Sequence, residues 1–230
     1  MSVYYEDDLV TLHLGDCLQV TEWLDADVLV TDPPYGAQMV SFAGGGGRNP
    51  KHGRNSNGGR TPNAIQGDLT PAARDQALAL WGNRPSVVFG SWRVERPPAV
   101  RSLLIWHKEG AYSGPLNAAF FNNHEEVYII GDGAWRKSAP PLRSVITTTE
   151  HRGSSSRDTG HPTSKPIGLM ELLIDRCPPG TIADPFAGSG STLIAAKYEG
   201  RKAIGVEIDE AYCELIARRL SQDTLFGGVA

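Results

Sequence analysis

The amino-acid sequence predicts an α/β protein built on a mostly parallel central sheet. Three observations favour this class. Short apolar runs of strand length alternate with segments of helical period, and several of the apolar runs end at Asp, Gly or Pro. The length of 230 residues is also enough to bury one sizeable sheet. We therefore expect a single domain over residues 1–230.

The N-terminal part of the chain shows two strand patterns with a helical pattern between them. Residues 10–14 alternate apolar and polar side chains and end at Gly15-Asp16, and residues 18–24 have an amphipathic helical period. Residues 27–31 form a buried-strand pattern that stops at Asp32-Pro33-Pro34-Tyr35. Both predicted strands thus end at residues with side-chain acceptors.

The alternation continues through the rest of the chain. Pro71 opens a helix to about residue 81, because proline suits a first helical turn. Further strands are expected at residues 86–89, 102–106, 126–130, 181–183 and 202–206, and further helices at 166–177, 191–198 and 210–220. Residues 221–230 are expected to be a loose tail.

Two long segments interrupt this regularity. Residues 38–66 include four consecutive glycines, and residues 131–161 are similarly irregular. Loops of this length in a compact domain are usually functional or disordered. Both carry positive charge although the net charge is −4, so they are candidate DNA contacts, with solvated loops of incidental charge as the alternative. The residues concerned are Arg48, Lys51, Arg54, Arg60, Arg136, Lys137, Arg143, Arg152 and Arg157.

Composition and cysteine usage point to a cytoplasmic protein. With 40% apolar and 21% charged residues the chain is of ordinary globular composition, and its longest apolar runs are too short to span a membrane. The polar, acidic N-terminus shows no secretory signal. Cys17, Cys177 and Cys213 lack metal or disulfide spacing, so we expect reduced thiols and no metal site, with Cys177 as a helix-end core residue.

Residues 184–192 (DPFAGSGST) form a glycine-rich turn between a predicted strand and a predicted helix. Glycines allow a ligand to approach the backbone, and the helix that follows offers unpaired N–H groups. A phosphate loop of an NTPase requires a lysine after the glycines, which is missing here. Glu207 ends the next predicted strand, where an acid is suited to ribose hydroxyls. We favour nucleoside binding over a tight turn with a surface glutamate.

Asp32-Pro33-Pro34-Tyr35 combines an acceptor side chain, a rigid backbone and an aromatic ring. The two prolines fix the direction of the backbone carbonyls. Asp32 and the Pro33 carbonyl are suited to accept from an amine on a planar ring, while Tyr35 stacks on its face. Considered alone, a proline-stiffened turn with a buried tyrosine explains the motif equally well.

Together these motifs resemble a known enzyme family. Asp32-Pro33-Pro34-Tyr35 is similar to the catalytic motif of amino-methyltransferases, and residues 184–192 resemble their cofactor motif. Since the catalytic motif comes first, the order resembles the permuted β class of DNA amino-methyltransferases. The resemblance implies their Rossmann-like fold with circularly permuted motifs. If the two strands are neighbours, cofactor and substrate meet across one crevice.

The resemblance implies S-adenosylmethionine as the cofactor. Residues 161–166 (HPTSKP) are similar to an additional cofactor-pocket segment of this class, and Asp16 matches the acid that contacts the cofactor adenine. The implied cofactor-binding residues are Asp16, Asp32, Thr163, Ser164, Lys165, Asp184, Phe186, Ala187, Gly188, Ser189, Gly190, Ser191, Thr192 and Glu207.

The resemblance also implies the reaction and its partners. The methyl group goes to an exocyclic amine of a base flipped out of double-stranded DNA, with Asp32, Pro33, Pro34 and Tyr35 as the catalytic residues. Phe42 or Trp92 could assist in stacking, although both residue types are more often core. A homodimer and a cognate restriction nuclease are compatible with this class, and the sequence decides neither.

Several functional alternatives stay open. Relatives acting on cytosine N4 tend to have serine before Pro-Pro-Tyr, so Asp32 favours adenine N6. A cofactor-binding regulatory module without catalysis is an alternative of another class, against which the intact Asp32 and Tyr35 argue. A nicotinamide oxidoreductase would leave the Asp-Pro-Pro-Tyr motif unexplained.

Overall fold

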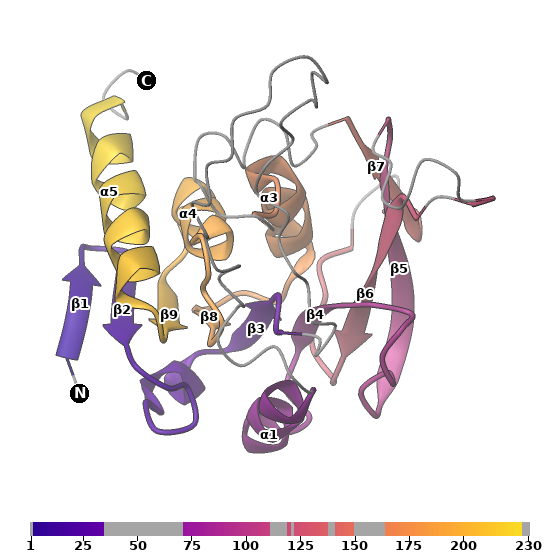
Figure 1. The fold of residues 1–230 in the computed structure, drawn as a ribbon, viewed down its shortest axis with the longest axis horizontal. Helices are drawn as coiled ribbons and strands as arrows, with labels where there is room; N and C mark the ends of the chain where they lie inside the picture. The colour runs from indigo at the N-terminus through magenta and orange to yellow at the C-terminus, as the bar shows by residue number, and fades with distance from the viewer. Residues whose placement is uncertain are drawn as a thin grey trace, which may run out of the picture.

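The computed structural model describes residues 2–34, 71–110, 119–120, 122–137, 141–149 and 164–226. Within them one sheet has the strand order β1-β2-β9-β8-β3-β4-β6-β5-β7 (Figure 1). The strands are β1 (Ser2–Glu6), β2 (Val10–Leu14), β3 (Val28–Thr31), β4 (Ser86–Gly90), β5 (Val100–Lys108), β6 (His124–Ile130), β7 (Val145–Thr148), β8 (Ile182–Asp184) and β9 (Ala203–Glu207). The helices are η1 (Glu22–Asp25), α1 (Ala72–Trp81), α3 (Ile167–Arg176), α4 (Ser191–Tyr198) and α5 (Glu210–Phe226).

The centre of the sheet is parallel, which confirms the predicted fold class. Strands β2, β9, β8, β3 and β4 are successive parallel neighbours. Strand β1 runs antiparallel to β2, and β6 runs antiparallel to both β4 and β5. The carboxyl ends of the five central strands therefore share one edge of the sheet, which we call the site edge.

The chain reverses its direction of winding between β3 and β8. These two strands are paired, with Val28 opposite Ile182 and Leu29 opposite Ala183. After β3 the chain passes to β4 on one side, whereas after β8 it passes to β9 on the other. In open α/β sheets a ligand crevice forms beyond the carboxyl ends of strands at such a switch point. Asp32 and Asp184 are the residues at those two ends.

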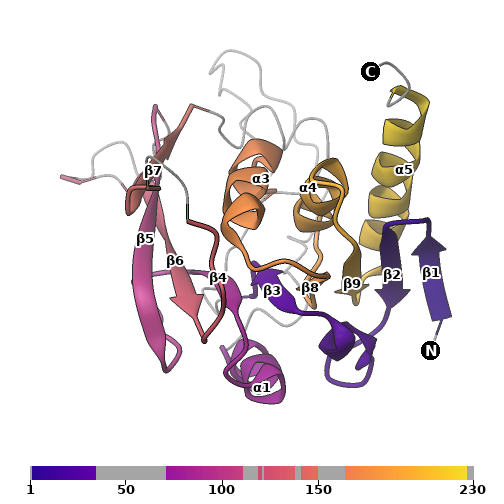
Figure 2. The same cartoon turned by 180° about the vertical axis from the view of Figure 1, so that it is seen from behind.

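Helices cover both faces of the sheet. Helices α3, α4 and α5 lie on one face, while α1 and η1 lie on the other, as Figures 1 and 2 show from opposite sides. Each face has its own apolar cluster. On the α1 face the rings of Trp23 and Trp81 stack with centroids 5.8 Å apart. Burying one side chain of this size contributes about 1.5–3 kcal/mol, so each cluster holds its helices firmly against the sheet. No helix of the described residues is both long and apolar enough to cross a membrane.

Two predictions for the N-terminal part differ from the structure. The helix expected at residues 18–24 is wrong: a turn comes first, and only the 3-10 helix η1 follows. The Asp16 carboxylate accepts the Leu18 N–H at 2.9 Å, and the Asp16 carbonyl accepts the Val20 N–H at 2.8 Å, so a local turn satisfies these groups instead. Strand β1 was not predicted, because its polar and acidic residues resemble an exposed terminus.

Two predictions for the C-terminal half also need correction. The segment 131–161 was expected to be irregular, but Val145–Thr148 forms β7, which pairs in parallel with β5. The loose tail was expected from residue 221, but α5 continues to Phe226. The four residues of β7 lack a strong period of their own and form a strand in the context of β5. Residues 38–66 lie outside the described residues, as do residues 138–140 and 150–161 of the second segment.

Candidate active site

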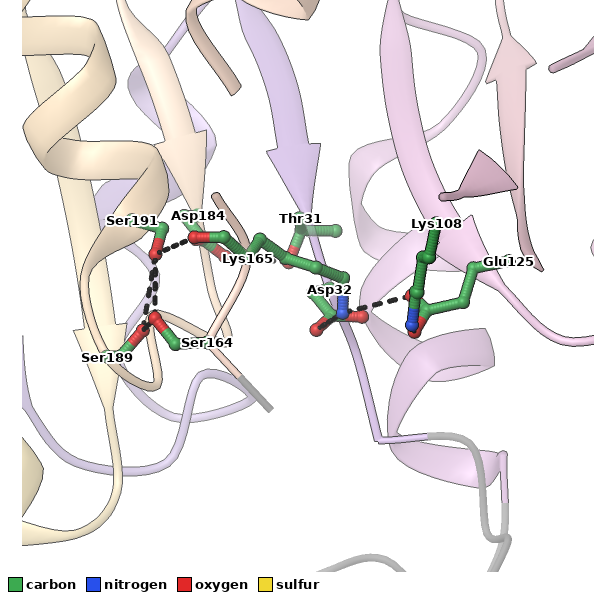
Figure 3. A network of polar contacts seen from close by, with 9 residues as sticks. All are labelled: Thr31, Asp32, Lys108, Glu125, Ser164, Lys165, Asp184, Ser189 and Ser191. Atoms are coloured by element: carbon green, nitrogen blue, oxygen red, sulfur yellow. Dashed lines mark hydrogen bonds and ion pairs between the residues drawn. The ribbon is translucent and has the colours of Figure 1, made fainter. Parts of the chain in front are cut away.

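The two sequence motifs meet at the site edge. Asp32 directly follows β3, and Asp184 is the last residue of β8. The Thr31 hydroxyl donates a hydrogen bond to Asp184 Oδ1 at 2.7 Å, although the two residues are 153 positions apart in the chain (Figure 3). The expectation that these strands are neighbours is therefore confirmed.

Asp184 is a buried acid with unusual titration. Its side chain is only 2% exposed, and it also accepts the Phe186 N–H at 3.2 Å. Burial raises the pKa of Asp184 to about 7, although hydrogen bonds from Thr192 and Thr31 oppose the shift. The carboxyl group below the glycine-rich turn thus changes its charge close to neutral pH.

The glycine-rich turn has a backbone that requires glycine. Gly188 has a φ of 53° and Gly190 a φ of 80°, both in the left-handed region. A Cβ on Gly190 would also lie 2.9 Å from Ile216 Cγ1 of helix α5. The turn therefore packs closely under α5 and delivers the chain into helix α4, which begins at Ser191.

Glu207 and Asp16 extend the same edge toward β2. Glu207 ends β9 and is 8% exposed; its Oε2 accepts the Gly188 N–H at 2.7 Å, and its Oε1 accepts the Asp209 N–H at 2.9 Å. Burial raises the pKa of Glu207, while these backbone donors oppose the shift. Each carboxylate oxygen can accept a second hydrogen bond. Asp16 follows β2, the parallel neighbour of β9.

These features fit the nucleoside part of S-adenosylmethionine. Three acids stand at the ends of three adjacent strands, and they suit a ligand that offers hydroxyl and amine donors. Ala187 and Gly188 bring backbone close to this row of acids. Within the described part of the chain no group of three or more His, Cys, Asp or Glu side chains is arranged to hold a metal.

A buried serine cluster joins the segment before α3 to the glycine-rich turn. Ser164 Oγ lies 2.9 Å from Ser189 Oγ and 3.4 Å from Ser191 Oγ. The Ser191 hydroxyl donates to the Lys165 carbonyl at 2.8 Å. These serines were predicted to contact the cofactor; the structure brings them together, and their hydroxyls bind one another and the backbone. Thr163 lies outside the described residues.

Lys165 connects the site to two residues that sequence reasoning missed. Its ammonium contacts Asp32 Oδ2, and it lies 3.3 Å from Glu125 Oε2 at the start of β6 (Figure 3). Glu125 Oε1 in turn contacts the ammonium of Lys108, the last residue of β5. Two adjacent acids at the start of the apolar run of β6, at the site edge, are the sequence signal that could have indicated Glu125.

The charges of this group reinforce one another. Burial opposes the charge on Lys165, but the carboxylates of Asp32 and Glu125 outweigh it and raise its pKa. Burial also opposes the charge on Glu125, but Lys165 and Lys108 outweigh it and lower the pKa of Glu125 to about 2. Lys165 and Glu125 are therefore both charged at neutral pH.

The predicted DNA contacts are placed unevenly. Arg136 lines a hollow with Thr181 and Lys202, which precede β8 and β9, so Arg136 lies at the edge opposite Asp32. Arg136 also contacts the Asp175 carboxylate. The cause is the antiparallel course of β6, which returns the chain to that edge. Arg136 therefore lies away from Asp32, and its role as a DNA contact, like that of the adjacent Lys137, stays a prediction.

Other predicted residues are exposed or fall outside the description. Arg143 is exposed just before β7. Trp92 follows β4 at the site edge and is 57% exposed, so it is not a core residue, and its role in stacking stays a prediction. Cys177 is buried at the end of α3, as expected. The residues outside the described ranges are Tyr35, Phe42, Arg48, Lys51, Arg54, Arg60, Arg152 and Arg157.

Comparison with known proteins identifies relatives over most of the chain. A family model described as DNA methylase (N6_N4_Mtase) matches residues 95–218. YubD of Escherichia coli (strain K12), named as a methylase, is 31% identical over 218 residues, which are 90% of this chain and 88% of YubD.

Solved structures show the same fold. The M1.HpyAVI–SAM complex has a TM-score of 0.65 at 19% identity, over 92% of this chain and 99% of that chain. The PvuII DNA methyltransferase, described as cytosine-N4-specific, has a TM-score of 0.64 at 17% identity, over 94% of this chain and 88% of that chain.

Proposed function

This chain belongs to the N6/N4 DNA methylase family, and on that premise we propose that it methylates the exocyclic N6 of adenine in double-stranded DNA. It is a DNA methyltransferase with a Rossmann-like fold. Its cofactor is S-adenosylmethionine, held by the acids and the glycine-rich turn at the site edge. The hydrogen bond from Thr31 to Asp184 carries the proposal, because it joins the catalytic motif to the cofactor turn.

The chain's own residues hold and orient the amine. When bound, S-adenosylmethionine supplies an electrophilic methyl group on its sulfonium. Asp32 and the Pro33 carbonyl accept the two amine hydrogens, so that the nitrogen becomes more tetrahedral and its lone pair is directed out of the ring plane. Acceptors already in place then stabilise the positive charge that develops on the amine.

The target base has to leave the duplex to reach Asp32, since its amine is otherwise paired. Asp32 is 23% exposed and Pro33 is buried, so both amine acceptors are largely enclosed at the site edge. Tyr35 stacks on the flipped base in this proposal. The exposed ring of Trp92, on the same edge, is available to contact DNA.

The choice of base rests on Asp32. Family members that act on cytosine tend to have serine at this position, so aspartate favours adenine N6. Mixed-sequence duplex DNA incubated with methyl-labelled S-adenosylmethionine, then digested and separated by nucleoside chromatography, should give labelled N6-methyladenine. Labelled N4-methylcytosine would assign the alternative base. If folded, cofactor-binding protein labels no base, the regulatory-module alternative is correct and the enzyme proposal is wrong.

Asp32→Asn tests the amine acceptor directly. Removal of the charge should lower the single-turnover rate by about 10²–10³-fold, because stabilisation of the developing positive charge is lost. Cofactor affinity, measured by quenching of tryptophan fluorescence, should change by no more than about threefold, since the change acts on the transition state. Asp132→Asn, exposed at the opposite edge, serves as the control. A variant at position 32 that keeps full activity would exclude this role.

A further inference from the structure

Four charged side chains, one of them the amine acceptor Asp32, form a chain of ion pairs at the site edge. Lys165 lies between Asp32 and Glu125, and Lys108 contacts Glu125 on the other side (Figure 3). The four come from separate places in the chain: after β3, the end of β5, the start of β6 and the segment before α3. Their exposed fractions are 23% for Asp32, 13% for Lys108, 19% for Glu125 and 7% for Lys165. They are hereafter the charge quartet.

The charge quartet is electrically neutral, with two carboxylates and two ammonium groups. Two aromatic rings lie against it: the Lys165 Nζ lies 4.9 Å from the centroid of the Phe89 ring, and the Lys108 Nζ lies 4.4 Å from that of Trp106. Asp184 interacts electrostatically with Asp32. Because the four side chains are largely enclosed, the loss of one charge leaves a neighbouring charge uncompensated.

Lys165 has two opposed effects on Asp32. By binding Oδ2 it restricts the rotation of the carboxylate, which favours a defined acceptor geometry. An ammonium bound to Asp32 alone, however, would withdraw negative charge from the acceptor and would repel the positive charge that develops on the amine. Because Glu125 shares the Lys165 ammonium, it limits this second effect.

We propose that Glu125 is a positioning residue for the methyl transfer: through Lys165, and with Lys108 as its counter-ion, it holds Asp32 in place while the quartet stays neutral. The inference rests on the proposed function, because it assumes that Asp32 accepts the amine. Glu125 does not touch the substrate in this scheme and acts only through Lys165.

Glu125→Gln and Glu126→Gln form a matched pair for the test. Glu126 is the next residue of β6 and is also buried and ion-paired, but its partners are Arg96 at 2.6 Å and Tyr128, away from Asp32. Glu125→Gln should lower the single-turnover rate by about tenfold or more, the effect expected of an orienting partner, with dissociation constants for cofactor and DNA within about threefold. Glu126→Gln should keep the rate within about threefold of the unsubstituted protein, even where it lowers stability.

A double variant that restores the neutral charge of the quartet separates the electrostatic effect of Glu125 from its effect on packing. Lys108→Gln combined with Glu125→Gln leaves Asp32 and Lys165 as a neutral pair. The double variant should be faster than Glu125→Gln alone, since the excess positive charge is gone. A purely structural role for Glu125 predicts instead that the double variant is no faster, and that result overturns the inference.

A stability cycle provides a readout that needs no activity. Asp32→Asn and Glu125→Gln each leave Lys165 one carboxylate, whereas the double variant leaves its ammonium with neither. Urea unfolding should therefore show a loss in the double variant that exceeds the sum of the two single losses. The stability losses of Asp32→Asn and Glu126→Gln should be additive in the corresponding double variant. If the stability losses of Asp32→Asn and Glu125→Gln are additive, or if Glu125→Gln has an unchanged rate, only the role of Glu125 is refuted. If the unsubstituted protein transfers no methyl group, the proposed function is refuted, and this inference with it.

Discussion

At the scale of single residues, burial decides the chemistry of the acids. Asp184 and Asp32 stand at the ends of paired strands, yet only Asp32 contacts an ammonium group. Asp184 is enclosed and has its pKa raised to about 7 by burial. Glu125 lies beside two ammonium groups, which lower its pKa to about 2 against the effect of burial. Within one site, the pKa of one carboxyl group is thus raised and that of another is lowered.

The titration of Asp184 should appear as a pH-dependent stability. Its folded pKa is raised above the unfolded value, so its contribution is fully present below the unfolded pKa of 3.8 and is lost as pH rises through about 7. Between pH 5 and pH 8 this amounts to roughly 2–3 kcal/mol. Asp184→Asn lacks the titration. Urea unfolding should therefore show that the stability of Asp184→Asn relative to the unsubstituted protein improves from pH 5 to pH 8. Parallel pH profiles of the two proteins would contradict the assignment.

At the scale of elements, hydrogen bonds between strand ends assemble the site. The Thr31 hydroxyl joins the end of β3 to Asp184 of β8, and the buried serines join the segment before α3 to the turn before α4. Neither contact belongs to the regular pairing of the sheet. They add side-chain contacts between the motifs beyond the backbone register of β3 and β8.

Thr31→Val tests this junction with nearly the same side-chain volume. The variant leaves Asp184 buried with one donor fewer, so the free energy of unfolding at pH 8 should fall by about 1–3 kcal/mol. The same change at Thr11, in β2 and not at the junction, is the control. Urea unfolding measures both, and equal losses in the two variants would argue against a special role for the contact between Thr31 and Asp184.

At the scale of the whole molecule, cofactor and substrate sites lie at one edge because the winding reverses between β3 and β8. The crossovers leave in opposite directions, so both strand ends stay open to ligands. The antiparallel strands β6 and β5 then bring Glu125 and Lys108 to the same edge and carry residues 131–137 to the other. One topology thus explains both the charge quartet and the position of Arg136 at the opposite edge.

Cofactor binding should stabilise the whole domain by mass action. At a concentration of 100 times its dissociation constant, S-adenosylmethionine should add about 2.7 kcal/mol, measurable as a rise in melting temperature. Glu207→Gln replaces one of the two carboxylate oxygens by an NH₂ group, which then faces the N–H donor of either Gly188 or Asp209, so the same concentration should give a clearly smaller rise. Glu199→Gln, on the surface after α4, should keep the full rise. An unchanged rise in Glu207→Gln would remove this residue from the proposed cofactor site.

Properties that depend on neighbours in sequence could be predicted without coordinates. The strand at Val10–Leu14 and the helix at Ser191–Tyr198 have the predicted bounds, because their periods are strong and local. The glycine-rich turn was also recognisable, since left-handed backbone favours glycine. Strand β7 escaped prediction because its four residues depend on pairing with the end of β5.

Local sequence patterns predict the fold class, the order of the motifs and their positions at strand ends, because periodicity, turn chemistry and residue type are properties of short segments. Three features are visible only in the folded chain: β3 lies beside β8, Lys165 reaches Asp32 and Glu125, and Asp184 titrates near neutral pH. The physical reason is that strand order, ion pairing and burial arise from contacts between residues far apart in the chain, which local patterns do not encode.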